Sequence, residues 1–153
     1  IWEEKFAEYK ENFLRMTNDD IKPVIELALP DKFVEQIKNN EAIILHGGDD
    51  HLIQYWLRQY DLPSLWQNKV VAASSAGSDA LVKYFWTCDW RQCLKGLNIL
   101  PIKFIPHYKS SYGNNDPRGP IDWEKAYEEL VKYGDESLPI QALEEGEFII
   151  IEK

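Results

Sequence analysis

The feature that most constrains this sequence is a repeated pattern in which a short apolar run ends in a turn and is followed by helical periodicity. Residues 42–45 lead directly into the pair Gly47-Gly48, and residues 70–73 lead into a turn that contains Ser75. Apolar side chains then recur at the spacing of an amphipathic helix. Strands that alternate with helices are typical of a mostly parallel sheet with helices on both faces. The pattern therefore predicts a doubly wound α/β fold.

The remaining segments extend this pattern over the whole chain. The periodicity predicts helices near residues 2–13, 33–37, 52–57, 80–84 and 123–131, and strands at residues 24–29, 42–45, 70–73 and 99–105. Two further apolar runs, residues 140–143 and 148–151, flank a turn at residues 144–146 and predict a C-terminal hairpin. Because no linker or repeat divides the sequence, we interpret residues 1–153 as a single domain.

Charge and composition narrow the range of partners. A formal net charge of −9 argues against nucleic acid, since binding phosphates requires clustered Lys and Arg. The longest apolar runs are far shorter than the ~20 residues that span a bilayer, so we expect no contact with a membrane. No basic and then apolar segment opens the sequence, which makes the cytoplasm the expected location. Three scattered histidines and the pair Cys88 and Cys93 form no ligand pattern, so we expect neither a metal nor another cofactor.

Ser75 lies between a predicted strand and a predicted helix, in the sequence Ala73-Ser74-Ser75-Ala76-Gly77. A nucleophile elbow is a sharp turn of this kind, which lifts one Ser hydroxyl above the sheet. Ala73 and Gly77 are the small residues that let neighbouring backbone approach the turn. The N–H of Ala76 would then face a developing oxyanion. The alternative interpretation is that Ser74 and Ser75 simply cap the helix.

Gly47-Gly48 and His107 are expected near Ser75. All of them follow predicted strands, and ligand sites in open α/β sheets lie at the carboxyl ends of the strands. His107 also begins a polar loop, from which an imidazole can take the proton of a Ser hydroxyl. A plain strand-to-helix turn remains the alternative for the glycines, and His46 and His51 compete with His107 as the base.

A triad also needs a carboxylate that orients the imidazole. Glu144 and Glu145 lie in the predicted hairpin turn, and Asp79 and Asp89 follow Ser75. The chain has 26 acidic residues, so composition does not distinguish among these four.

The motifs occur in a distinctive order along the chain, namely Gly47-Gly48-Asp49, Ser75-Ala76-Gly77, the run GLNILP at residues 96–101, Pro106-His107 and Glu145-Gly146. This order resembles the dipeptidase E and cyanophycinase family of serine peptidases. The resemblance runs from about residue 24 to the C-terminus. It implies a flavodoxin-like sheet related to that of class I glutamine amidotransferases, with a Ser in place of their Cys.

The resemblance also implies roles for individual residues. Ser75 would be the nucleophile and His107 the general base, with Glu145 as the acid of the triad and Glu144 as the alternative. The N–H groups of Gly48 and Ala76 would form the oxyanion hole.

Further residues would lie on the substrate side or support the site. Gly47 and Asp49 belong to the glycine turn, and Asp89 corresponds to an Asp that the family holds near its site. Arg118 or Arg91 would hold the acidic side chain of a substrate. The implied substrates are small peptides with an aspartyl residue, either at the N-terminus or in β-linked aspartyl-arginine units.

The sequence departs from the family pattern in two ways. Ala73 and His46 replace glycines that the family has before the nucleophile and at the start of the glycine turn. The strand that usually precedes the first helix is also missing, which would leave a gap and an exposed edge in the sheet. We consider three interpretations of this difference: the sequence is a fragment, it is a divergent short member, or its fold is completed by another chain or in a homodimer. A non-catalytic binding domain and another serine hydrolase, an esterase or amidase, are the alternative functions.

Overall fold

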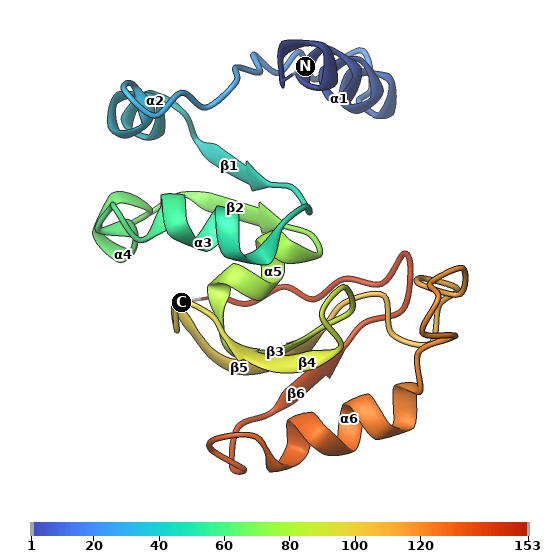
Figure 1. The fold of residues 1–153 in the computed structure, drawn as a ribbon. Coiled ribbons are helices and arrows are strands. Elements are labelled where there is room, and N and C mark those ends of the chain that lie inside the picture. The colour runs from blue at the N-terminus through green and yellow to red at the C-terminus, as the bar shows by residue number, and fades with distance from the viewer. Residues whose placement is uncertain (1, 153) are drawn as a thin grey trace. The chain divides into compact units, whose positions relative to one another are not determined.

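The computed structural model describes residues 2–152, and the chain divides after Asn40 into two compact units. The first unit contains two helices, α1 (Trp2–Met16) and α2 (Phe33–Asn39), close to where the periodicity predicts them (Figure 1). The first turn of α1 is acidic and its last turn is basic, which suits the dipole of a helix.

The strand predicted at residues 24–29 is wrong. This segment is irregular, and the side chain of Gln36 in α2 satisfies its backbone in place of a neighbouring strand. The N–H of Leu29 donates to Gln36 Oε1 at 2.9 Å, and Gln36 Nε2 donates to the carbonyl of Leu27 at 2.8 Å. Val24 is 89% exposed, so the apolar run is not a buried strand.

The second unit carries the α/β pattern. Its elements in chain order are β1 (Ala42–Leu45), α3 (Asp50–Leu57), α4 (Leu62–Leu65), β2 (Val70–Ala73), α5 (Ala76–Leu81), β3 (Val82–Thr87), β4 (Gln92–Lys95), β5 (Leu100–Ile105), α6 (Trp123–Lys132) and β6 (Ile140–Ala142).

The strands of this unit form two sheets. β1 and β2 pair in parallel, and the other four strands follow the order β4-β3-β5-β6. β3 pairs with β5 and β5 with β6 in parallel, whereas β3 and β4 pair antiparallel. The predicted fold class is confirmed, because the unit is a mixed α/β structure with mostly parallel strands that is compatible with a flavodoxin-like fold.

The predicted C-terminal hairpin is wrong. β6 pairs in parallel with β5, and residues 148–151 form no strand. The chain instead turns after β6 and runs toward the end of β5, where the N–H of Tyr108 donates to the carbonyl of Leu143. Phe148 and Ile150 are consequently left largely exposed.

The helix predicted at residues 80–84 also differs from the structure. α5 ends at Leu81, and Tyr84 lies in β3, a strand that the sequence interpretation missed together with β4. Apart from Lys83, β3 consists of β-branched and aromatic residues, which favour a strand over a helix.

One core cluster lies between the four-stranded sheet and α6, the helix that runs beside the sheet (Figure 1). Trp86 and Ile105 from the sheet pack with Ala126 and Leu130 of the helix. Asp122 caps α6, with its side chain accepting from the N–H of Lys125. This packing fixes β3 and β5, and so fixes the loops that follow them.

Candidate active site

Ser75 occupies a sharp turn between β2 and α5. Its backbone has φ 49° and ψ −124°, a conformation that residues with a side chain rarely adopt. The Ser75 side chain makes no capping hydrogen bond to α5. The alternative in which Ser75 merely caps the helix is therefore wrong, since its hydroxyl is directed to another partner.

Two glycines allow other backbone segments to approach this turn. A Cβ atom on Gly47 would lie 2.9 Å from Ser75 Cβ, and one on Gly77 would lie 2.4 Å from the carbonyl oxygen of Leu45. Real Cβ contacts are not this short, so both positions require glycine. The glycine turn after β1 therefore packs directly against Ser75.

His107 is the partner of Ser75. Ser75 Oγ and His107 Nε2 are 2.9 Å apart. His107 follows β5 through Pro106 and has a positive φ of 55°, which turns its side chain away from the strand direction. Tyr112 stacks on the imidazole, with ring centroids 4.3 Å apart and an interplanar angle of 10°. Tyr112 was not predicted from the sequence, although an aromatic residue shortly after Pro-His was a usable signal.

Glu145 contacts the other ring nitrogen of His107. The distance between His107 Nδ1 and Glu145 Oε1 is 2.5 Å. The turn after β6 holds this carboxylate in place, because Leu143 exchanges backbone hydrogen bonds with Ile105 and Tyr108. The N–H of Glu144 instead donates a hydrogen bond within the turn, to Glu147 Oε2. Of the four acids left open by the sequence, Glu145 is thus the one hydrogen-bonded to His107 within the described residues.

The two residues predicted to form the oxyanion hole, Gly48 and Ala76, both lie close to Ser75. Ala76 is the first residue of α5, and the first N–H groups of a helix have no acceptor within the helix. Gly48 has φ 149° and lines the same small cavity as Ser75, which has a volume of about 10 Å3. Asp49 has a structural role, since its side chain caps α3 by accepting from the N–H groups of His51 and Leu52.

Asp89 and Arg118 lie together at the border of the site. Tyr112 donates to Asp89 Oδ1 at 2.7 Å, which raises the pKa of the Tyr112 hydroxyl above its ordinary value. Arg118 donates to the carbonyl of Asp89 and to both carboxyl oxygens of Asp116. These bonds hold the pKa of Asp116 well below its usual range. Arg91 donates to the carbonyls of Gly113 and Gly119, so both arginines fasten the loop that carries Tyr112.

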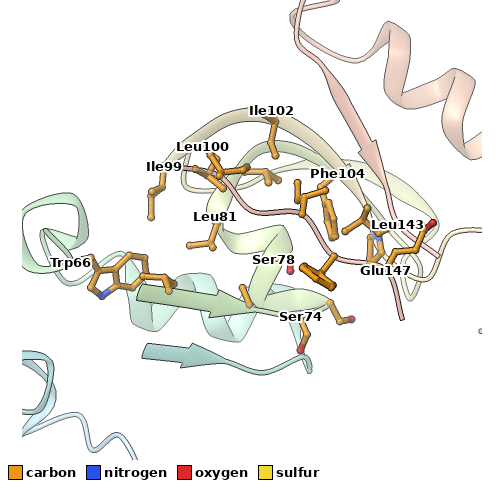
Figure 2. Close-up of a pocket in the computed structure, with 18 of the residues that line it drawn as sticks. Trp66, Ser74, Ser78, Leu81, Ile99, Leu100, Ile102, Phe104, Leu143 and Glu147 are labelled. Carbon is orange, nitrogen blue, oxygen red and sulfur yellow. The ribbon is translucent and has the colours of Figure 1, made fainter. Parts of the chain in front are cut away.

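A cavity of about 930 Å3 opens beside Ser75 and His107 (Figure 2). Its walls are mainly apolar and include Trp66, Leu81, Leu100, Ile102 and Phe104. Lys69, Glu144, Glu145 and Glu147 add charges to its lining. The cavity can therefore accept an apolar group next to the Ser75 hydroxyl.

Within residues 2–152, no group of three or more His, Cys, Asp or Glu side chains is placed to hold a metal ion. Cys88 and Cys93 are free, and burial raises the pKa of Cys93 to about 11 and that of Cys88 above its ordinary value. In the same described range, no helix has the length and apolar character needed to cross a membrane.

A comparison with protein-family models matches residues 3–153 to Peptidase family S51. The match covers nearly the whole chain. It confirms the resemblance to the dipeptidase E and cyanophycinase family that the order of the sequence motifs indicates.

Proposed function

We propose that this chain, which belongs to peptidase family S51 and is a serine-type peptidase, hydrolyses small peptides with a Ser75, His107 and Glu145 triad. The observation that carries the proposal is the unbroken series of hydrogen bonds from Ser75 Oγ through both ring nitrogens of His107 to Glu145. This is the order of nucleophile, base and orienting acid in a serine catalytic triad.

Acylation begins with the hydroxyl proton of Ser75. The Ser75 O–H donates to His107 Nε2, and His107 Nδ1–H donates to Glu145 Oε1. As Ser75 Oγ forms a bond to the carbonyl carbon of the peptide, the proton passes to Nε2. His107 then delivers this proton to the leaving amine as the peptide bond breaks, and the acyl group remains on Ser75.

The oxyanion of each tetrahedral intermediate accepts from the N–H groups of Gly48 and Ala76. A water molecule then gives a proton to His107 and attacks the acyl group. His107 returns this proton to Ser75 Oγ as the ester bond breaks, which releases the carboxylic acid product and restores Ser75. Oxyanion donors of this type are typically worth about 3 kcal/mol each in the barrier. Their effect depends on the glycine turn staying close to Ser75.

The substrate is a peptide that joins an aspartyl residue to an apolar residue. Family membership supports the aspartyl preference, and Arg118 beside Asp89 is the candidate that receives its carboxylate. The apolar walls of the large cavity support an apolar residue on the other side of the scissile bond.

A fluorophosphonate probe tests the nucleophile. The wild type is expected to gain the mass of one adduct, and Ser75→Ala is expected to gain none. Ser74→Ala is the matched control, because Ser74 lies in the same turn and is expected to leave the labelling intact. Labelling of Ser75→Ala, or none of a folded wild type, would refute the proposed nucleophile and favour a non-catalytic binding domain.

A small panel of peptides tests the substrate. Aspartyl-leucine is expected to be cleaved faster than alanyl-leucine and faster than aspartyl-aspartate. Arg118→Ala is expected to reduce the preference for the aspartyl residue and to leave labelling by the probe in place. If simple esters are cleaved and none of these peptides is, the specificity proposed here is wrong.

A further inference from the structure

A pair of buried carboxyls, Asp50 and Asp79, lies beside the elbow and is not used by the proposed mechanism. Asp50 is the first residue of α3 and comes two residues after Gly48, whereas Asp79 lies in α5, four residues after Ser75. They are 5% and 2% exposed. Both carboxyls line the same small cavity, and Thr87 Oγ1 donates to Asp50 Oδ2 at 2.6 Å.

A hydrogen bond between two carboxyl groups requires a proton on one of them. Within the described residues, no ion pair involves Asp50 or Asp79, and the Oδ1 atoms of both have no hydrogen-bond partner. Burial raises the pKa of both groups, and Asp79 is raised further. The other titratable groups near the pair are His51 of α3, Cys88 and Asp89 after β3, and Tyr112 of the following loop.

The two carboxyls differ in their surroundings. Asp50 accepts a hydrogen bond from Thr87 Oγ1, which favours its charged form. Asp79 is the more deeply buried, and the charges of Asp50 and Asp89 also disfavour its ionisation. The proton therefore belongs on Asp79 and the charge on Asp50.

We infer that Asp50 and Asp79 share one proton, and that the resulting hydrogen bond holds the glycine turn against the Ser75 elbow. Both are positioning residues, because they act through Gly48 and Ser75 and do not touch the reacting atoms. The inference rests on the proposed function of Ser75 and Gly48.

The connectivity explains how this bond controls the site. Asp50 is joined to Gly48 through a single residue, and Asp79 N–H donates to the carbonyl of Ser75 at 2.9 Å. All four residues line the same small cavity. Loss of the shared proton places two negative charges side by side, and their repulsion separates the glycine turn from the elbow. The N–H of Gly48 then no longer reaches the oxyanion, so the reaction of Ser75 slows as the pH rises.

The experiment follows the infrared band of a protonated carboxyl and the rate of fluorophosphonate labelling over the same range of pH. Asp79→Asn keeps a donor toward Asp50 and cannot ionise, and it is expected to lack the band and to label within about threefold of the wild type at neutral pH. Asp79→Ala is expected to label about tenfold more slowly. The rate constant for the reaction of the bound probe should fall, and the affinity for the probe should not change. Asp135→Asn is the control, since Asp135 bonds Ser137 away from the site and its substitution is expected to leave the band in place.

The inference predicts that wild-type labelling declines as the band disappears with rising pH, and that Asp79→Asn shows no such decline. No band at neutral pH, or the same decline in Asp79→Asn, would overturn it. Failure of the proposed function is distinguishable, because the wild type would then label at no pH. In that case the infrared band and the hydrogen exchange of the first turn of α3 test the inference without labelling. The inference predicts that the amides of this turn become less protected from exchange as the band disappears.

Discussion

At the scale of single residues, the site is built on backbone conformations that cost free energy. Ser75 and His107 both have positive φ values although neither is glycine. Such residues cost about 1–3 kcal/mol each and persist only where the surrounding structure enforces them. Gly47 and Gly77 make the required contacts possible at Ser75, and Tyr112 stacks on His107. The same local strain that destabilises the fold directs the two side chains toward each other.

Replacement of Glu145 by Gln tests the acid of the proposed triad. Glu145→Gln is expected to slow labelling of Ser75 by about 10- to 100-fold, because an amide no longer stabilises the imidazolium of His107. The loss should stay below the roughly 10⁴-fold cost at a buried triad acid, since the Glu145 side chain is 63% exposed. Glu144→Gln is the matched control and should retain the wild-type rate. Equal losses in the two variants would contradict the assignment of Glu145.

Replacement of Gly47 by Ala tests the close packing against Ser75. The added methyl would lie 2.9 Å from Ser75 Cβ, so the glycine turn or the elbow must move. We expect labelling to fall by about tenfold or more while the protein remains folded by circular dichroism. Gly119→Ala is the control, since its Cβ would meet open space, while its φ of 84° strains the backbone in a way that Gly47→Ala does not. If Gly119→Ala impairs labelling as strongly, general destabilisation and not the contact with Ser75 explains the loss.

At the scale of elements, the sequence predicted those segments whose local signals agree with their tertiary setting. β1, β2 and β5 are apolar runs ended by turns, and α6 has both an apolar face and a capping Asp122. β3 and β4 were missed because Ala80, Leu81 and Tyr84 have helical spacing across the junction of α5 and β3. The strand assigned to residues 148–151 failed because apolar content alone does not supply a pairing partner.

Site prediction met a similar limit. Residues that follow strands could be placed at one edge of the sheet from the pattern alone, which brought Ser75, His107 and the glycine turn into one hypothesis. Asp50 and Asp79 carry no such signal, because a carboxyl at a helix start usually faces solvent or caps the helix. Only the packing of α3 against α5 shows that both are buried.

Lys103, a buried lysine of β5, binds the C-terminal end of α6 through its side chain. Lys103 is fully buried, and its Nζ donates to the carbonyls of Leu130 and Val131 at the end of α6. Lys103→Met is expected to destabilise the protein by about 2–4 kcal/mol, because it leaves two buried carbonyls without a donor. Chemical denaturation with α6 followed by hydrogen exchange measures this effect. Lys95→Met on β4 is the control, and similar losses in both variants would argue against a specific role of Lys103.

At the scale of the whole molecule, every residue of the proposed site belongs to the unit that follows Asn40. Asp50 and Asp79 of that unit are buried, whereas most of the acidic residues behind the net charge of −9 are not. A buried neutral acid makes the fold less stable as the pH rises, whereas an exposed, hydrogen-bonded carboxylate makes the fold less stable as the pH falls. The pH dependence of unfolding therefore separates the two kinds of acid.

Burial raises the pKa of Asp79 well above its ordinary value of 3.8 in the folded state. The unfolded chain consequently loses this proton first as the pH rises, so the stabilisation from neutral Asp79 is complete below about 3.8 and is lost progressively up to the raised folded pKa. Asp79→Asn removes this dependence. Its urea midpoint is expected to exceed that of the wild type by a margin that grows with pH above about 4 and then becomes constant. Asp135→Asn should behave oppositely, because hydrogen bonds from Ser137 lower the pKa of Asp135 and stabilise the fold at neutral pH. A difference between Asp79→Asn and wild type that does not change with pH would mean that Asp79 is ionised in the folded protein.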